Sequence, residues 1–213
     1  MIELRLPVFC YITDRKNSPI PLLDALQRAV DAGVDWIQLR EKDLPARDLL
    51  ELALETKKMT IGRPVKILVN DRLDVALAAD LDGVHLPASS LPVSSIREAA
   101  RRHPLMIGVS THSFEELLCA ARAGASYVTF GPVFPTPSKS ACGEPCGLAE
   151  FQQAARLAPI PVLALGGVNA GNVLACLQAG AGGIAAIRLF QDPLIDIKAL
   201  VTRLRAGDLP GKT

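Results

Sequence analysis

The chain alternates short apolar runs with segments of helical periodicity along almost its whole length. Continuous apolar runs of strand length are typical of strands buried on both faces, as in parallel sheets covered by helices. The runs lie at Val8–Thr13, Trp36–Leu39, Val65–Val69, Gly83–Leu86, Met106–Val109, Tyr127–Phe130, Pro161–Leu165 and Gly183–Ile187. This pattern predicts a parallel sheet.

A segment with helical periodicity follows each of these runs. Ser113 and Glu116 have the spacing of a capping box, and Asn169 is a predicted cap for the helix that follows it. Ala46–Glu51 is predicted to begin the second helix. The predicted helices are Leu22–Ala32, Leu49–Met59, Leu73–Ala79, Ser94–Arg102, Ser113–Ala123, Leu148–Leu157, Ala170–Ala179 and Pro193–Arg205.

The dipeptide Ala-Gly marks a repeat of about two βα units. It precedes predicted strands at Ala32-Gly33, Ala123-Gly124 and Ala179-Gly180, and Ala79-Asp80 is a degenerate copy. Glycine at this point ends a helix and turns the chain into the next strand.

Eight βα units in 213 residues favour a closed barrel over a doubly wound open sheet. An open sheet of that kind normally has a glycine-rich turn after its first strand, and Thr13-Asp14-Arg15-Lys16 contains no glycine. We therefore predict an α/β fold, a single (β/α)8 TIM-barrel domain over residues 1–213.

Composition argues against several classes of partner. The net charge of +1 and the aromatic content of 4% give no sign of nucleic-acid or membrane binding. Glu3 and Arg5 do not fit a signal peptide, so a cytoplasmic location is expected. The sequence leaves the oligomeric state open, and a homo-oligomer is one expectation.

The five cysteines, at positions 10, 119, 142, 146 and 176, are scattered and lack the spacing of a zinc site. We interpret them as free thiols, with Cys142 and Cys146 exposed in a long loop. A redox pair between these two is the alternative.

Polar residues and one glycine pair lie where the predicted strands end, and in a barrel these ends surround the active site. They are Gln38, Arg40, Lys42, Asn70, Asp71, Arg72, His85, Ser110, Thr111, His112, Thr136, Ser138, Lys139, Gly166, Gly167 and Arg188. The loop from Phe130 to Lys139 is stiffened by prolines and suits an anionic ligand. Taken alone, such a loop is more often a solvated connection.

The types of these residues predict a phosphate or diphosphate site. Gln38, Arg40 and Lys42 share one face of an extended chain and suit a polyanion, unless the two cations pair with Glu41 and Asp43 instead. The Gly166-Gly167 turn lies where barrels hold phosphate, although a glycine pair also serves as a simple tight turn.

Asp71 and His112 have two interpretations each, and His85 has one. Asp71 is a candidate Mg²⁺ ligand or the cap of the next helix, and one carboxylate alone is too few for a tight metal site. His112 is a candidate acid or base, or only a helix-start residue. His85 has apolar neighbours, and we expect a core role for it.

Six ordered motifs resemble those of thiamine-phosphate synthases and their sister group, the TenI-type thiazole tautomerases. They run from about the first strand to the eighth: Gln38–Lys42, Val69–Arg72, Asp82–Leu86, Gly108–Ser113, Gly131–Lys139 and Ala164–Val168. Members of this group are (β/α)8 barrels. A synthase joins hydroxymethylpyrimidine diphosphate to thiazole phosphate and releases pyrophosphate.

The resemblance implies a role for each matching residue. Gln38, Arg40, Lys42, Asn70, Ser110 and Lys139 would hold the diphosphate, and Asp71 would bind Mg²⁺. The thiazole phosphate would bind to Thr136, Ser138, Gly166, Gly167, Ile187 and Arg188.

Two positions depart from the family pattern. Ser90 stands where synthases usually have a second Mg²⁺-binding Asp, which predicts a weaker metal site. Arg188 replaces a typical Ser. The sequence of Leu86-Pro87 is closer to the tautomerases, in which a His at the position of His112 moves the proton. The first hypothesis is therefore a synthase, and the alternatives are a thiazole tautomerase and a non-catalytic binder of thiazole or thiamine phosphate.

Overall fold

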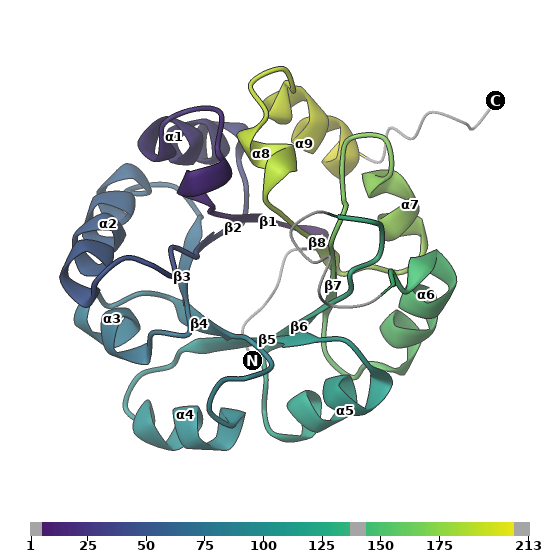
Figure 1. Cartoon of the computed structure of the whole chain (residues 1–213), viewed down its shortest axis with the longest axis horizontal. Helices are drawn as coiled ribbons and strands as arrows, with labels where there is room; N and C mark the ends of the chain where they lie inside the picture. Colours follow the sequence, from purple (N-terminus) through teal and green to yellow (C-terminus); the bar gives the residue numbers. More distant parts are fainter. Residues whose placement is uncertain (1–5, 137–143, 207–213) are drawn as a thin grey trace.

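The computed structural model describes residues 6–136 and 144–206, and these form a closed barrel of parallel strands (Figure 1). The strands pair in sequence order, and the last closes on the first, with Val8 beside Gly183. They are β1 (Val8–Ile12), β2 (Trp36–Leu39), β3 (Lys66–Asn70), β4 (Gly83–Leu86), β5 (Met106–Thr111), β6 (Tyr127–Phe130), β7 (Val162–Leu165) and β8 (Gly183–Ala186). The predicted TIM barrel is confirmed.

The α-helices form an outer ring around the barrel (Figure 1). They cover the strands with apolar faces, which join the outward-facing strand residues in one core. They are α1 (Leu22–Ala32), α2 (Ala46–Met59), α3 (Leu73–Ala78), α4 (Val93–Ala99), α5 (Phe114–Arg122), α6 (Gly147–Leu157), α7 (Val173–Gln178), α8 (Arg188–Gln191) and α9 (Ile197–Ala206). A short 3-10 helix, η1 (Arg15–Asn17), follows β1.

Two predicted helices begin three or four residues later than predicted, whereas the other predicted starts agree within one residue when Ala46 is taken as the start of the second helix. The seventh begins at Val173 and not at Ala170, because Asn169 forms a turn instead of a cap. Its Oδ1 accepts the N–H of Gly171 at 2.8 Å, and its own N–H donates to Asn172 Oδ1 at 2.8 Å. Local side-chain bonds of this kind compete with helix formation.

The segment predicted as one last helix, Pro193–Arg205, is a turn followed by α9. Asp192 Oδ1 accepts the N–H of Leu194 at 2.9 Å and keeps this segment in a turn. Asp196 Oδ1 accepts the N–H of Ala199 at 2.9 Å, and the helix therefore begins only after Asp196. The one-turn helix α8, which precedes this turn, was not predicted.

Large apolar side chains fill the lower part of the barrel interior. Val8, Cys10, Trp36, Leu68, Met106 and Tyr127 belong to this inner cluster. Gly108 makes room for Tyr127, since a Cβ at Gly108 would lie 2.2 Å from the tyrosine Cζ. Side chains on a strand alternate in direction, so the next inward position above Trp36 is Gln38. The barrel interior is therefore filled by apolar side chains near the amino ends of the strands and becomes polar toward their carboxyl ends.

The described cysteines are free thiols, as predicted. Cys146 is half-buried rather than exposed, and burial raises the pKa of its thiol to about 11. Cys142 lies outside the described residues, so a pair with Cys146 stays untested. None of the helices in residues 6–136 and 144–206 is both long enough and apolar enough to span a membrane.

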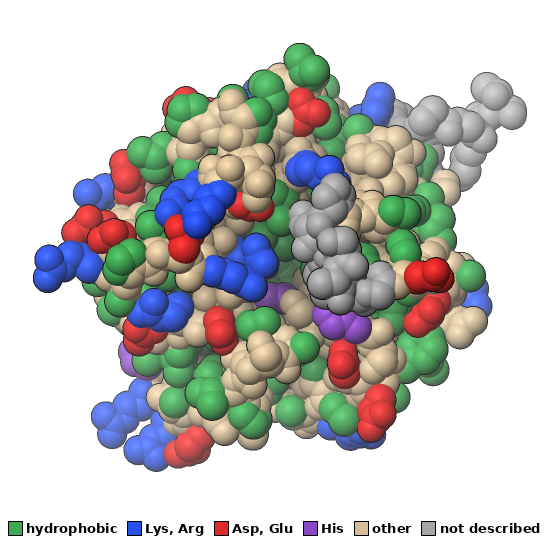
Figure 2. All heavy atoms as spheres, viewed as in Figure 1, with side chains coloured by type: hydrophobic (Ala, Val, Ile, Leu, Met, Phe, Trp, Pro, Cys, Tyr) green, Lys and Arg blue, Asp and Glu red, His purple; other side chains and the backbone are tan. Residues whose placement is uncertain are grey.

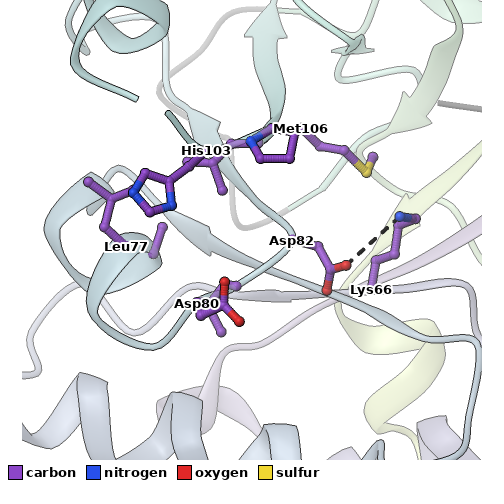
Figure 3. Close-up of a pocket in the computed structure, with 10 residues that line it drawn as sticks. Lys66, Leu77, Asp80, Asp82, His103 and Met106 are labelled. Carbon is purple, nitrogen blue, oxygen red and sulfur yellow. Dashed lines mark ion pairs between the residues drawn. The ribbon is translucent and has the colours of Figure 1, made fainter. Parts of the chain in front are cut away.

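A cavity of about 390 Å³ lies at the amino ends of β3, β4 and β5, between α3 and the loop that leads into β5. Figure 3 shows Asp82 facing Lys66 at its wall, with 3.8 Å between Oδ1 and Nζ. Asp82 also accepts the N–H of Ile67 at 2.8 Å. Residues at this end of a barrel serve stability, since catalytic groups come from the opposite end.

Candidate active site

A cavity of about 460 Å³ opens at the carboxyl ends of the strands. Figure 2 shows Lys and Arg side chains beside the central hollow of the molecule and His side chains within it. The lining comes from every strand end: Ile12, Asp14, Asn17, Gln38, Arg40, Lys42, Asn70, His85, Pro87, Ala88, Ser110, His112, Thr136, Leu165, Gly166, Gly167, Val168, Ala185, Ala186, Ile187 and Arg188.

All but three of the described residues at the predicted strand ends line this cavity. Asp71 and Arg72 line an adjoining cavity of about 240 Å³ that shares Lys42, Asn70 and Pro87 with the main one. Thr111 is buried, and its hydroxyl donates to Thr129 O at 3.0 Å. Ser138 and Lys139 lie outside the described residues.

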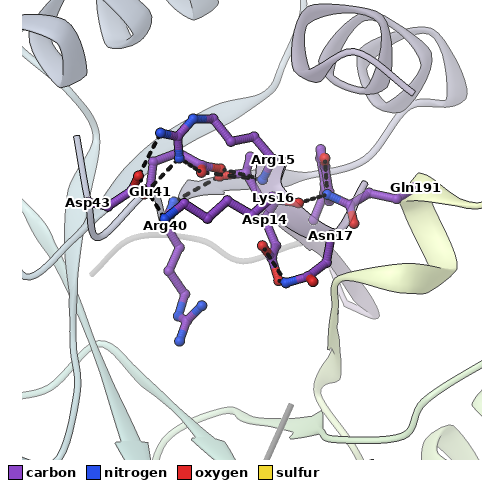
Figure 4. Close-up of polar contacts among 10 residues, drawn as sticks. Asp14, Arg15, Lys16, Asn17, Arg40, Glu41, Asp43 and Gln191 are labelled. Atoms are coloured by element: carbon purple, nitrogen blue, oxygen red, sulfur yellow. Dashed lines mark hydrogen bonds and ion pairs between the residues drawn. The ribbon is translucent and has the colours of Figure 1, made fainter. Parts of the chain in front are cut away.

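Arg40 and Lys42 face the main cavity because the acidic residues between and after them have other partners. The buried carboxylate of Glu41 accepts the backbone N–H of Arg15 at 3.2 Å and its guanidinium at 3.2 Å. Figure 4 shows the Arg40 guanidinium pointing away from this cluster. The alternative interpretation, in which Arg40 and Lys42 pair with Glu41 and Asp43, is wrong for the described residues.

Asp43 completes the same cluster on the surface. It accepts two bonds from the Arg15 guanidinium, both at 2.7 Å, and its Oδ2 lies 3.1 Å from Lys16 Nζ. The hydrogen bonds from Arg15 hold the pKa of Asp43 well below its usual range. The cluster joins the loop after β1 to the loop after β2, and both loops border the cavity.

Gln38 and Asn70 form the floor on the β2 and β3 side. Gln38 Nε2 donates to Asn70 Oδ1 at 3.2 Å. Gln38 is buried, and its Oε1 has no hydrogen-bond partner among the described residues. A buried acceptor without a partner is costly, so this oxygen suits a ligand that donates a hydrogen bond.

Asp71 is held in place by its neighbours and does not cap a helix. Its backbone is left-handed, with φ at 60°, and its N–H donates to His85 O at 2.9 Å. Its carboxylate accepts a hydrogen bond from the hydroxyl of Ser90. Helix α3 has Arg72 at its N-cap position without a side-chain bond, so the capping interpretation is wrong.

His85 is buried as predicted, yet it also lines the cavity. Its Nδ1 lies 3.0 Å from the hydroxyl oxygen of Tyr127, and its Nε2 lies 2.9 Å from Ser110 Oγ. The imidazole thus connects the apolar interior of the barrel to a predicted site residue. The expected core role describes only half of its position.

His112 lies at the end of β5 with its ring against the next strand end. Its Nδ1 forms a hydrogen bond with Gly131 O, and its backbone N–H donates to Glu116 Oε2 at 2.6 Å. Ser113 Oγ accepts the N–H of Glu116 at 3.2 Å, which confirms the predicted serine cap. Glu116 therefore orients the backbone of His112 rather than that of Ser113.

The Gly166-Gly167 turn lies against the loop that follows β6. Both glycines have positive φ, 95° and 66°, and a Cβ at Gly167 would lie 2.7 Å from Phe134 Cβ. Phe134 N–H donates to Gly166 O at 3.0 Å. Within the described part of the chain, the N–H groups of Gly167 and Val168 donate to no protein acceptor, and both residues line the cavity.

Arg188 extends this corner of the site. Its Nη2 lies 3.4 Å from Thr136 Oγ1, so it connects the end of β8 to the loop after β6. A guanidinium, a hydroxyl and free backbone N–H groups around one corner are the donors that a phosphate group requires.

Sequence reasoning missed Asp14 and Asn17, which follow β1 and also line the cavity. Asn17 Nδ2 donates to Asp14 Oδ2 at 2.9 Å. The rule that selected the other strand ends selects Asp14 as well, since it follows the predicted strand Val8–Thr13. Asn17 lies in η1, which no apolar pattern marks.

A (β/α)8 barrel with cations, hydroxyls and free N–H groups around a cavity at its carboxyl end is typical of enzymes that act on phosphorylated substrates. A family model described as thiamine monophosphate synthase matches residues 9–190. The chain therefore belongs to the thiamine monophosphate synthase family.

Named relatives and a solved structure agree with this family. A Geobacter sulfurreducens protein, provisionally named a thiamine-phosphate synthase, is 45% identical over 85% of this chain and 86% of its own length. The thiamine-phosphate synthase of Roseiflexus sp. (strain RS-1) is 41% identical over 83% of this chain and 75% of its own. The structure of thiamine phosphate pyrophosphorylase from Pyrococcus furiosus superposes with a TM-score of 0.83 at 33% identity, covering 96% of this chain and 97% of that one.

Proposed function

We propose that this enzyme joins hydroxymethylpyrimidine diphosphate to thiazole phosphate and releases pyrophosphate, forming thiamine phosphate. The observation that carries the proposal is the direction of Arg40 and Lys42. Both face the cavity, and among the described residues neither is neutralised by an ion pair. Two such cations are suited to a diphosphate, and an isomerase of a monophosphate does not need them.

The bond that breaks joins the pyrimidine methylene carbon to the diphosphate oxygen. Negative charge grows on the departing diphosphate, and Arg40 and Lys42 would stabilise it there. The resemblance assigns Gln38 and Asn70 to the diphosphate, but the unpartnered Gln38 Oε1 is an acceptor and a diphosphate has no hydrogen to donate to it. We therefore assign this floor to the pyrimidine, whose amino group can donate a hydrogen bond.

The thiazole phosphate would bind at the opposite corner. The N–H groups of Gly167 and Val168, the guanidinium of Arg188 and the hydroxyl of Thr136 would surround its oxygens. This corner and the two diphosphate cations line the same cavity, so both substrates would fit in it with the reacting atoms between them.

The donor set of the smaller cavity fits Mg²⁺ held jointly by protein and substrate. Mg²⁺ commonly binds one or two carboxylates together with water and substrate phosphates. Asp71 would supply the carboxylate, with the Ser90 hydroxyl beside it. The described residues contain no group of three or more His, Cys, Asp or Glu side chains arranged for a metal. When bound, the ion would neutralise charge on the diphosphate.

The test is product formation from the two substrates with Mg²⁺ and with a chelator. We expect thiamine phosphate only with Mg²⁺, and its loss in Asp71→Asn, which keeps the side-chain size and removes the charge. Lys139→Ala should also abolish turnover. Turnover that persists in excess chelator would contradict a metal-dependent synthase.

A second candidate is the thiazole tautomerase, favoured by the uncharged Ser90 beside Asp71 and by His112 in the cavity. In that case His112→Asn would abolish isomerisation while thiazole phosphate still bound. A third outcome is a non-catalytic binder, for which the ligand would raise the melting temperature and neither reaction would run. Cytoplasmic location and homo-oligomeric assembly stay predictions.

A further inference from the structure

His85 lies between a buried phenol and a serine hydroxyl that lines the cavity. Tyr127 is fully buried, and His85 is 2% exposed. The two ring nitrogens are used in opposite directions, Nδ1 toward Tyr127 Oη at 3.0 Å and Nε2 toward Ser110 Oγ at 2.9 Å. The direction of each hydrogen bond follows from counting the protons.

The tyrosine determines which nitrogen carries the proton. A buried O–H has to donate a hydrogen bond, because leaving it without an acceptor costs the full desolvation penalty. Within the described part of the chain, the hydroxyl of Tyr127 has the Nδ1 of His85 as its hydrogen-bond partner. Burial raises the pKa of Tyr127 well above its usual range, so the phenol keeps its proton. Nδ1 is therefore the acceptor, and the neutral imidazole carries its proton on Nε2.

The serine hydroxyl then receives a hydrogen bond from the imidazole. His85 Nε2–H donates to Ser110 Oγ at 2.9 Å, and Thr129 Oγ1 lies 3.5 Å from the same oxygen, which is longer than an ordinary O–H···O hydrogen bond. A hydroxyl has two lone pairs and one hydrogen, so its own hydrogen is left to point elsewhere. Ser110 lines the cavity, and the cavity is where that hydrogen finds an acceptor.

We propose that His85 is a positioning residue that sets Ser110 as a hydrogen-bond donor into the cavity, toward an anionic oxygen of the substrate. This inference rests on the proposed synthase reaction, in which negative charge grows on the departing diphosphate. A donor aligned before the reaction stabilises such charge without reorganisation. Ser110 then acts neither as a nucleophile nor as a base, since its hydrogen is not taken by His85.

Gly108 belongs to the same arrangement. A Cβ at this position would lie 2.2 Å from Cζ and 2.3 Å from the hydroxyl oxygen of Tyr127. Only glycine leaves the tyrosine ring where its hydroxyl reaches His85. Gly108 in β5 therefore makes room for Tyr127, and Tyr127 in turn determines which nitrogen of His85 in β4 carries the proton.

The first arm of the test needs no substrate. Long-range ¹H–¹⁵N NMR spectra of the labelled protein report the tautomer of each histidine, and the His85 signals are identified by their loss in His85→Gln. We expect the Nε2–H form for His85 in the parent protein and a loss of that preference in Tyr127→Phe. A Nδ1–H form in the parent protein would overturn the proposal.

The second arm measures kcat and KM separately. His85→Leu removes the donor and should lower kcat about 10- to 100-fold, with KM changed less than about threefold. His85→Gln retains an N–H donor and should recover part of the loss. In a Ser110→Ala background, His85→Leu should add less than about threefold. Fully multiplying effects would show that His85 acts independently of Ser110 and would overturn the proposal.

The two arms separate failure of this inference from failure of the proposed function. Absence of thiamine phosphate formation by the parent protein would contradict the synthase reaction, whereas the NMR result would still decide the proton position on His85. Circular dichroism and melting of each variant would identify a folding defect, and Tyr127→Phe changes only one buried oxygen.

Discussion

Glu41 accepts hydrogen bonds from both the backbone N–H and the guanidinium of Arg15, each at 3.2 Å. Glu41 is buried, and the cations next to it in the sequence, Arg40 and Lys42, both line the main cavity. We expect these two bonds to hold the segment from Arg40 to Lys42 in place at the edge of the cavity.

Glu41→Gln should therefore weaken diphosphate binding without touching the substrate. Gln keeps the size but loses the charge that holds Arg15, so the segment from Arg40 to Lys42 becomes less ordered. We expect KM for the pyrimidine diphosphate to rise about 5- to 50-fold, the equivalent of about 1–2 kcal/mol. Steady-state kinetics measures this change. Glu98→Gln, which breaks the exposed Glu98–Arg101 pair, is the matched control and should leave KM unchanged. Equal effects of the two variants would contradict the argument.

Ser90→Asp should lower the Mg²⁺ concentration that gives half-maximal turnover. The hydroxyl of Ser90 already contacts the carboxylate of Asp71, so a carboxylate introduced at position 90 lies within reach of the same ion. A second charged ligand strengthens a Mg²⁺ site. In a titration of activity against Mg²⁺, the concentration that gives half-maximal turnover should fall about threefold or more, which corresponds to roughly 0.6 kcal/mol.

Ser90→Ala serves as the comparison for this experiment. It removes the hydrogen bond to Asp71 without adding charge, and it should leave the Mg²⁺ requirement equal or higher. A Mg²⁺ titration that is identical in all three proteins would show that position 90 lies outside the metal site.

Gly167→Ala should destabilise the protein and damage the phosphate corner together. Its φ of 66° is unfavourable for alanine, and the new Cβ would lie 2.7 Å from both Phe134 Cβ and Pro135 O. We expect a loss of about 2–4 kcal/mol in the free energy of unfolding, the sum of a strained backbone and a steric clash. Urea denaturation measures it.

Gly62→Ala is the matched control for Gly167→Ala. Gly62 has a similar φ of 74°, yet nothing lies within 4 Å of a Cβ placed there. This variant carries the backbone strain alone and should cost about 1 kcal/mol. If the two variants were equally destabilised, the close packing of the Gly166-Gly167 turn against the loop after β6 would contribute nothing to the loss of stability.

Arg188→Ser should raise KM for thiazole phosphate and reduce its dependence on salt. The guanidinium lies 3.4 Å from Thr136 Oγ1 at the corner assigned to the phosphate, and a bond to a charged group contributes about 1.5–3 kcal/mol. KM measured at two salt concentrations checks both effects. Arg188→Lys keeps the charge but loses the two-pronged guanidinium, and its KM for thiazole phosphate should lie between those of the parent protein and Arg188→Ser. An Arg188→Ser enzyme with unchanged KM would show that the arginine only fills space.

Local pattern was sufficient for most of the fold. Continuous apolar runs and the Ala-Gly repeats predicted every strand, because strands buried on both faces leave a strong signal in sequence. The errors came where side chains compete with the helix for backbone hydrogen bonds, as Asn169 and Asp192 do. Such competition depends on local geometry that apolar periodicity does not record.

The sequence predicted which residues belong to the candidate site, but it did not predict which partners they contact. Strand ends meet at one end of a barrel, so the order of the strands is enough to place Gln38, Arg40, Ser110 and Thr136 in one cavity. Their partners could not be assigned in this way. Glu41 pairs with Arg15, which is 26 residues away in the chain, and not with the adjacent cations.

By itself, the sequence determined the barrel, and it predicted the end at which chemistry takes place and an anionic ligand, since each follows from local periodicity and residue type. Only the tertiary structure decided that Arg40 and Lys42 line the cavity while Glu41 pairs with Arg15, that Ser90 contacts Asp71 and that His85 links Tyr127 to Ser110. Those relationships join residues from different strands. The register and closure of the sheet determine them, and no local stretch of sequence contains that information.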